Sequence, residues 1–172
     1  MSPAPRFSAL ALALCGTAIV PGLAAQTRPA TLPRGSSFAI TGGRLLFDGS
    51  DSDVAIKSLT LRYTTLRPNG VSFDLGAGLV VGDAAGAFSL EVGPAFNISI
   101  PGATLLLRAG GTGIVAGGGG LVGGYAGVGV LFRVANGVGF RLDVARHQYA
   151  TGRESFGAWQ LGGGIAVLPR IR

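Results

Sequence analysis

One group of residues in this sequence is a candidate for nucleophilic catalysis. It consists of a histidine followed by a tyrosine, a glutamate and a serine. His147 is the single histidine of the chain, and Tyr149, Glu154 and Ser155 follow it. A serine nucleophile needs its hydroxyl within hydrogen-bond reach of a histidine base. Because Tyr149 and not a serine stands two residues after His147, we predict that the chain is not an enzyme.

Charged residues of both signs recur within stretches that otherwise alternate between apolar and small residues. They are three arginines and three acids: Arg62, Asp74, Glu91, Arg108, Arg141 and Asp143. Opposite charges in equal number neutralise one another when they are folded together. We therefore predict an internal ion-pair network that helps to specify the fold. A narrow polar or ion path along the same residues is the alternative.

The acidic stretch from Asp48 to Asp53 offers three carboxylates and two serine hydroxyls. Such oxygen ligands suit Ca²⁺, but their order differs from that of an EF-hand loop. Asp, Ser and Gly are also ordinary loop residues. We predict no metal site and no cofactor, and leave cation binding by this stretch open.

The elements that would position these residues are strands, because four stretches alternate with a period of two. From Phe88 to Ile100, even-numbered positions are apolar or proline, and odd-numbered positions are small or polar. The stretches 57–65, 71–79 and 138–144 repeat the pattern. Successive side chains of a strand point to opposite faces, so this period predicts strands with one apolar and one polar face.

Turn-forming residues divide the chain into about eight such strands. Tight turns are expected at 67–70, 101–102 and 135–137. Longer polar or glycine-rich links are expected at 48–53, 82–86, 117–120 and 150–155. The predicted strands are 36–46, 55–66, 70–81, 86–100, 103–115, 121–134, 138–149 and 157–168. An even number of strands with alternately short and long links is typical of an outer-membrane barrel.

Tight hairpins also predict which residues lie opposite one another. The first would place Arg62 opposite Asp74, and the third would place Leu131 opposite Arg141. Near the strand ends, Tyr149 and Trp159 are expected to lie in an aromatic girdle.

Volume decides which face of the barrel is turned outward. The interior of an eight-stranded barrel holds only the side chains that fill it, and the bulky apolar residues are too many to fit. The polar face is mostly Gly, Ala, Ser and Thr, which suit a crowded interior better than a surface in water. We predict an all-β fold, a closed antiparallel up-and-down transmembrane β-barrel with its apolar face in lipid.

A helical interpretation competes over residues 113–132, which carry no charge and are long enough for a helical span. Small residues at intervals of three or four could pack two such helices together. Nearly half of the segment is glycine, however, and each glycine costs a helix about 1 kcal/mol relative to alanine. Strands are therefore predicted here as well.

Residues 1–25 have the layout of a secretory signal peptide. Arg6 precedes an apolar stretch, and Leu23-Ala24-Ala25 supplies small residues for cleavage before Gln26. The apolar stretch is short for a membrane anchor. Leu14 before Cys15 is unsuited to a lipoprotein signal.

We accordingly divide the chain into a signal peptide over 1–25, a periplasmic lead-in over 26–35 and a barrel over 36–172. Only 13% of the residues are charged, against about 25% in an average soluble domain. The 14 basic and 8 acidic residues are scattered without a basic cluster, which argues against nucleic-acid binding.

Residues 36–168 resemble the small outer-membrane barrels of the OmpA/OmpX type. The resemblance rests on the predicted signal peptide, the number of strands, and the alternation of short and long links. The last strand contains four residues similar to the C-terminal assembly signal of that family: Gln160, Gly162, Ile165 and Val167. Many members end on an aromatic residue, whereas this chain continues from Leu168 to Arg172.

The resemblance implies a monomer in the outer membrane, inserted by the barrel-assembly machinery and in contact with outer-membrane lipid and lipopolysaccharide. A non-enzymatic structural, envelope-integrity or surface-contact role follows, with the lumen plugged by the charged network. A narrow channel is one alternative. A lipid-modifying enzyme of the lipid A deacylase kind, with His147 as its base, is the other.

Overall fold

The computed structural model describes residues 35–48, 56–82, 86–151 and 154–169. The predicted signal peptide, most of the lead-in and Cys15 lie outside these residues. So does the acidic stretch after Asp48.

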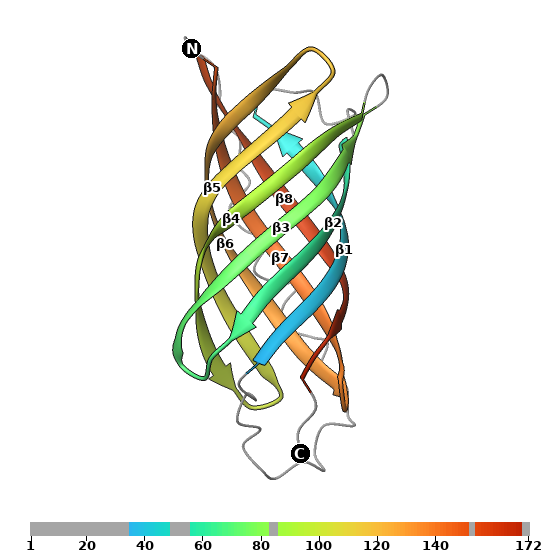
Figure 1. The fold of residues 1–172 in the computed structure, drawn as a ribbon, viewed down its shortest axis with the longest axis vertical. Coiled ribbons are helices and arrows are strands. Elements are labelled where there is room, and N and C mark those ends of the chain that lie inside the picture. The colour runs from blue at the N-terminus through green and yellow to red at the C-terminus, as the bar shows by residue number, and fades with distance from the viewer. Residues whose placement is uncertain (1–34, 49–55, 83–85, 152–153, 170–172) are drawn as a thin grey trace, which may run out of the picture.

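Eight antiparallel strands form a closed barrel, in which each strand pairs with its neighbour in sequence and β1 pairs with β8 (Figure 1). The predicted all-β barrel is thus confirmed. The strands are β1 (Gly35–Phe47), β2 (Ile56–Leu66), β3 (Gly70–Val81), β4 (Gly86–Ile100), β5 (Ala103–Ala116), β6 (Gly119–Ala135), β7 (Val138–Thr151) and β8 (Glu154–Val167).

Residues 113–132 belong to β5, β6 and the turn between them, so the helical interpretation is wrong. The described residues contain no helix that is long and apolar enough to cross a membrane. Glycines of this segment pair in register with the neighbouring strand, as Gly124 does with Gly111.

Two of the links that were expected to be long are short. Strands β5 and β6 pair as far as Ala116 and Gly119, which leaves only residues 117–118 between them. Strands β7 and β8 pair as far as Thr151 and Glu154. A ladder needs only backbone groups, so polar and glycine-rich segments can prolong a hairpin beyond its apolar part.

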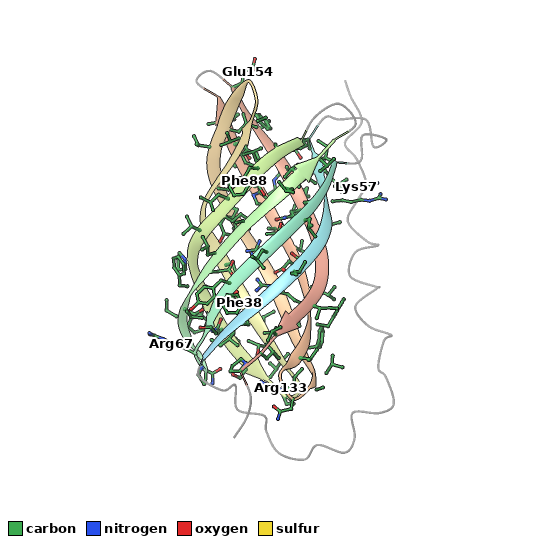
Figure 2. The ribbon with its side chains drawn as sticks, turned by 45° about the vertical axis from the view of Figure 1, so that its right-hand side comes forward. Phe38, Lys57, Arg67, Phe88, Arg133 and Glu154 are labelled. Atoms are coloured by element: carbon green, nitrogen blue, oxygen red, sulfur yellow. The ribbon has the colours of Figure 1, made fainter. Side chains whose placement is uncertain are left out.

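The two ends of the barrel differ, and we name them by their links. The turn end carries the links 67–69, 101–102 and 136–137, and the loop end carries the other four. Figure 2 shows Arg67 and Arg133 at the turn end and Glu154 at the loop end.

Hairpin register agrees with the prediction in one case and differs in the other. Leu131 lies opposite Arg141, as predicted. Asp74 lies opposite Thr64, however, and Arg62 lies opposite Gly76, so the predicted facing of Arg62 and Asp74 is wrong by two residues. A shift of two leaves every side chain on its own face of the sheet.

Bulky apolar side chains cover the outside of the barrel. Phe38, Leu61, Phe73 and Ile165 are among the large hydrophobic residues that remain exposed, and similar side chains occur on all eight strands. The alternate positions point inward and are mostly small or polar. The outward direction of the apolar face therefore agrees with the argument from volume.

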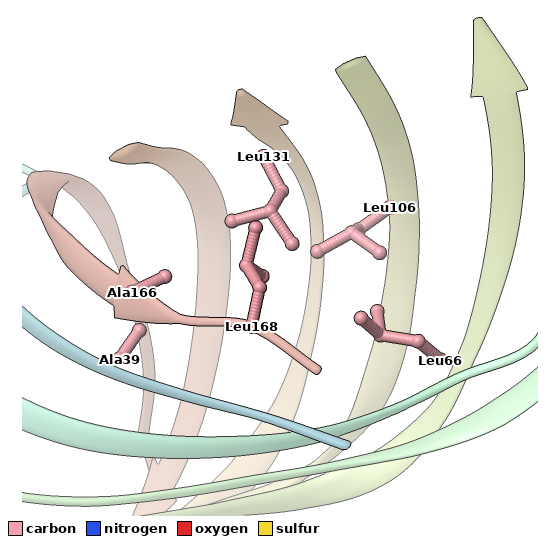
Figure 3. Packing of buried hydrophobic residues seen from close by; sticks show 6 residues of the cluster. All are labelled: Ala39, Leu66, Leu106, Leu131, Ala166 and Leu168. Atoms are coloured by element: carbon pink, nitrogen blue, oxygen red, sulfur yellow. The ribbon is translucent and has the colours of Figure 1, made fainter. Parts of the chain in front are cut away.

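Two buried apolar clusters close the interior near its ends. At the turn end, six side chains from different parts of the chain converge (Figure 3): Ala39, Leu66, Leu106, Leu131, Ala166 and Leu168. Leu168 follows the last strand, and its amide N–H donates to the carbonyl of Gly137 at 2.9 Å. A second cluster lies near the loop end: Leu45, Val80, Ile114, Tyr149 and Ala158.

Adjacent leucines on β5 offer a test of the two faces. Leu106 is 0% exposed and Leu107 is 41% exposed. We expect Leu106→Ala to lower the free energy of unfolding in detergent micelles by about 2–5 kcal/mol, because it leaves a cavity. Leu107→Ala removes the same atoms from the outer surface and should cost clearly less. Equal losses, measured by urea denaturation, would contradict the assignment of the faces.

Candidate functional site

The six charged residues singled out in the sequence lie together inside the barrel, between the two apolar clusters. They come from β2, β3, β4, β5 and β7, and none is more than 7% exposed. We call Arg62, Asp74, Glu91, Arg108, Arg141 and Asp143 the lumen charge cluster.

Asp74 is the centre of this cluster, because all three arginines contact its carboxylate. Arg62 Nη1 lies 2.5 Å and Arg108 Nη1 lies 3.3 Å from Oδ2. Arg141 Nη2 lies 3.4 Å from Oδ1. The Thr64 hydroxyl donates to the same Oδ1 at 2.5 Å. Asp74 is therefore surrounded by three guanidinium groups and one hydroxyl donor.

The two other carboxylates extend the cluster along the barrel. Arg62 Nη2 donates to Glu91 Oε2 at 2.5 Å. Arg141 Nε donates to Asp143 Oδ2 at 2.8 Å, and Arg108 Nη2 lies 2.9 Å from the other oxygen, Oδ1, of Asp143. Arg62 and Arg141 thus each contact two carboxylates. Arg108 contacts all three, because its Nη1 also lies 3.8 Å from Glu91 Oε2. The formal charges of the cluster sum to zero.

Two glycines provide the space that this cluster fills. A Cβ atom added to Gly76 would lie 3.1 Å from Arg62 Nη2. A Cβ atom added to Gly129 would lie 2.6 Å from Asp143 Oδ1. Sequence reasoning missed both residues, since a chain with 31 glycines does not show which of them face a charge.

His147 lies between the lumen charge cluster and the loop-end apolar cluster. Its Nε2 is 3.0 Å from Gln160 Oε1, and its ring stacks with those of Tyr125 and Tyr149, each at 5.7 Å between centroids. The Arg108 guanidinium lies 5.9 Å from the centroid of the Tyr125 ring. These contacts give His147 a packing role in the interior.

The structure does not bring His147 together with the candidate nucleophile. His147 pairs with Ala158, while Ser155 pairs with Ala150. Three residues of strand therefore separate Ser155 from the level of His147, which is about 10 Å. Ser155 and Glu154 are exposed, whereas His147 is buried.

One of the two predicted girdle aromatics points the other way. Tyr149 is buried and belongs to the loop-end cluster, because it stands two residues after His147 and so shares the inward face. Trp159 is 48% exposed and points outward, as predicted.

Asp48 joins the ends of β1, β7 and β8 on the outer side. Its carboxylate accepts hydrogen bonds from both terminal nitrogens of Arg146, and its amide N–H donates to the carbonyl of Gly157 at 2.9 Å. The Arg146 guanidinium also lies 5.4 Å from the centroid of the Trp159 indole. Hydrogen bonding by Arg146 lowers the pKa of Asp48 below its ordinary 3.8.

These contacts of Asp48 bear on the acidic stretch that it begins. The rest of that stretch, to Asp53, lies outside the described residues. Within the described part of the chain, no group of three His, Cys, Asp or Glu side chains is placed to hold a metal ion.

The residues that resemble an assembly signal divide between the two faces of β8. Ile165 and Val167 are exposed on the outer surface. Gln160 is buried with His147, and Gly162 pairs with Gly43 of β1 and with Asp143 of β7. Their role in assembly stays a prediction.

Solved structures share this fold at low sequence identity. The N-terminal β-barrel domain of OprF from Pseudomonas aeruginosa matches with a TM-score of 0.59 and 12% identity, over 78% of this chain and 97% of that one. Neisserial surface protein A (NspA) matches with a TM-score of 0.59 and 12% identity, over 77% and 96%. A designed transmembrane β-barrel matches with a TM-score of 0.56 and 16% identity, over 78% and 95%.

The fold is therefore that of the small transmembrane β-barrels. More closely, it is the eight-stranded architecture of OprF and NspA. No protein-family model matches the sequence, and no curated protein does.

Removing the central carboxylate tests the cluster. Asp74→Asn leaves three arginines with two carboxylates in a dry interior, so we expect it to lower the free energy of unfolding by about 3–5 kcal/mol. Urea denaturation of the folded chain in detergent measures this loss. Asp48→Asn breaks an ion pair on the exposed surface and serves as the control, with an effect near zero. A comparable loss in both variants would contradict the account.

The surface pair is testable separately by titration. The Asp48 carboxyl should titrate below pH 3.8 in the folded chain, because the bonded Arg146 favours its charged form. The contribution of the pair to stability is then present above that pH and is lost as the pH falls through the lowered pKa. Carbon-detected NMR should find that Arg146→Gln returns the pKa to its ordinary value. An unchanged titration would contradict the contact.

Proposed function

We propose that this chain is a non-enzymatic outer-membrane barrel with a structural, envelope-integrity or surface-contact role. The observation that carries the proposal is the outer surface of the closed barrel, which presents large apolar side chains on every strand. Exposed to water, so large an apolar surface would drive aggregation. In a bilayer it lies against lipid, and the closed barrel leaves no strand edge unpaired.

Strand length supports the same location. The shortest strand, β2, has 11 residues and the longest, β6, has 17. A tilted transmembrane strand needs about 9–11 residues. Every strand is therefore long enough to cross the apolar part of an outer membrane.

The lumen charge cluster supports a plugged interior rather than a channel. Water-filled pores leave their lining charges accessible, whereas these six side chains are buried between two apolar clusters. In the proposal the cluster stabilises the barrel and fixes the arrangement of its strands. Among the residues that the structure describes, no contact of His147 favours the lipid-modifying alternative.

The expected partners follow from this location. Outer-membrane lipid and lipopolysaccharide would surround the apolar belt. The barrel-assembly machinery would meet the exposed Ile165 and Val167 of β8, the strand that closes the barrel against β1. A monomer is expected because closure leaves no strand free to pair with a second copy.

Fractionation and electrophoresis test the proposal together. We expect the chain to sediment with outer membranes, and to migrate differently on a denaturing gel with and without boiling, as folded membrane barrels do. Planar bilayers containing the purified chain should show no conductance steps. A chain that stays soluble without detergent would contradict the location, and regular conductance steps would contradict the plug.

A further inference from the structure

Two basic residues lie directly opposite each other on the outer surface. Arg44 of β1 and Lys57 of β2 are Cα partners in the ladder, and both side chains are exposed. Figure 2 shows Lys57 extending away from the barrel wall. Like charges at directly opposite positions of an antiparallel pair destabilise it. The fold thus keeps together two cations that repel each other.

Apolar side chains surround this pair on its own face. Exposed hydrophobic residues occupy one adjacent outward position on each of β1 and β2 and the paired positions on β8 and β3: Leu46, Leu59, Leu161 and Val81. Gly42 is the adjacent outward position on β1 toward the turn end. It has no side chain to cover the barrel wall, and an added Cβ atom would meet nothing within 4 Å. The two charges therefore stand at the margin of the apolar belt and not in a polar surface.

A neighbouring cation shows how the fold neutralises a charge of this kind. Arg146 also points outward near the loop end, and it binds the Asp48 carboxylate and the Trp159 ring. Arg44 and Lys57 form no ion pair within the described part of the chain. Among the described residues, then, no carboxylate neutralises this basic pair.

We propose that Arg44 and Lys57 form a binding site for the phosphate of an anionic membrane lipid, with the lipid's acyl chains lying along the apolar wall beside Gly42. Neighbouring strands are about 4.8 Å apart, so two long basic side chains can reach one phosphate from both sides. A phosphate between them converts their repulsion into two charge-assisted contacts. This inference rests on the proposed membrane location.

The height of the pair fits a lipid headgroup. Trp159 lies opposite Leu46 across the β1–β8 seam, and Leu46 is two residues beyond Arg44 toward the loop end. An outward tryptophan marks the membrane surface. The backbone of the basic pair is therefore one step nearer the middle of the membrane than the tryptophan, and the long apolar stems of Arg44 and Lys57 let their charged ends reach the phosphate level.

Trp159 also provides the measurement, because it is the only tryptophan of the chain. The full-length protein is reconstituted in phosphatidylcholine vesicles that contain increasing fractions of phosphatidic acid with brominated acyl chains, which quench tryptophan at close range. Brominated phosphatidylcholine gives the reference. The ratio of the two quenching curves gives the relative affinity of the surface near Trp159 for the phosphate lipid.

We expect the native chain to prefer phosphatidic acid. Arg44→Gln and Lys57→Gln should each weaken the preference about fivefold, and the double variant about 25-fold. Arg67→Gln removes the same charge at the turn end and should change nothing. In pure phosphatidylcholine the double variant should be at least as stable as the native chain, because it lacks the repulsion.

Three results would overturn the inference. The first is a native chain that shows no preference for phosphatidic acid, and the second is a double variant that keeps this preference. The third is a preference that soluble inorganic phosphate abolishes, which would indicate a site for free anions. If the chain does not insert into vesicles at all, the membrane location fails, and this inference fails with it. Insertion without lipid preference removes the inference alone.

Discussion

Three arginines and three carboxylates lie buried inside the barrel, and their mutual neutralisation is the interaction on which the rest of the structure depends. An uncompensated charge in such a place costs several kcal/mol, so the cluster is tolerable only when all its members are present and in contact. Asp74 contacts all three arginines, and Arg141 also donates to Thr64 at 2.8 Å. These contacts join strands that are far apart in sequence. The contacts therefore depend on closure of the barrel, and they favour one arrangement of its strands.

The remainder of the interior follows from this requirement. Apolar clusters on either side exclude water, which strengthens each ion pair and penalises any misplaced charge. Glycine at Gly76 and Gly129 gives the guanidinium and carboxylate groups their space. Because charged and small residues occupy the middle of the interior and the two apolar clusters fill its ends, the remaining bulky hydrophobic side chains lie outside. The same alternation thus places the charged cluster inside the barrel and a surface suited to lipid outside it.

A period of two predicted the strands and their faces, because that period is local and strong. It could not predict register in the first hairpin, where Asn69 has a left-handed φ of 46° and the Thr65 hydroxyl accepts a hydrogen bond from the Phe73 amide. It could not predict every charge contact. The Arg62–Asp74 pair lies within one hairpin, but Arg108 and Arg141 reach Asp74 from strands that do not pair with β3. It also could not predict the length of the glycine-rich links, because backbone pairing continued where the apolar pattern had ended.

The central claim is a closed and water-free lumen, and thiol accessibility tests it most directly. Cys15 is the only cysteine of the chain, so Cys15→Ser gives a background in which the introduced cysteine is the single thiol. Ala145 points inward beside the lumen charge cluster and is 1% exposed, whereas Arg67 is exposed at the turn end. In the folded barrel, Ala145→Cys should resist a water-soluble thiol reagent and react only after unfolding, while Arg67→Cys reacts at once. Equal rates in the folded state would show a water path through the lumen and would contradict the account.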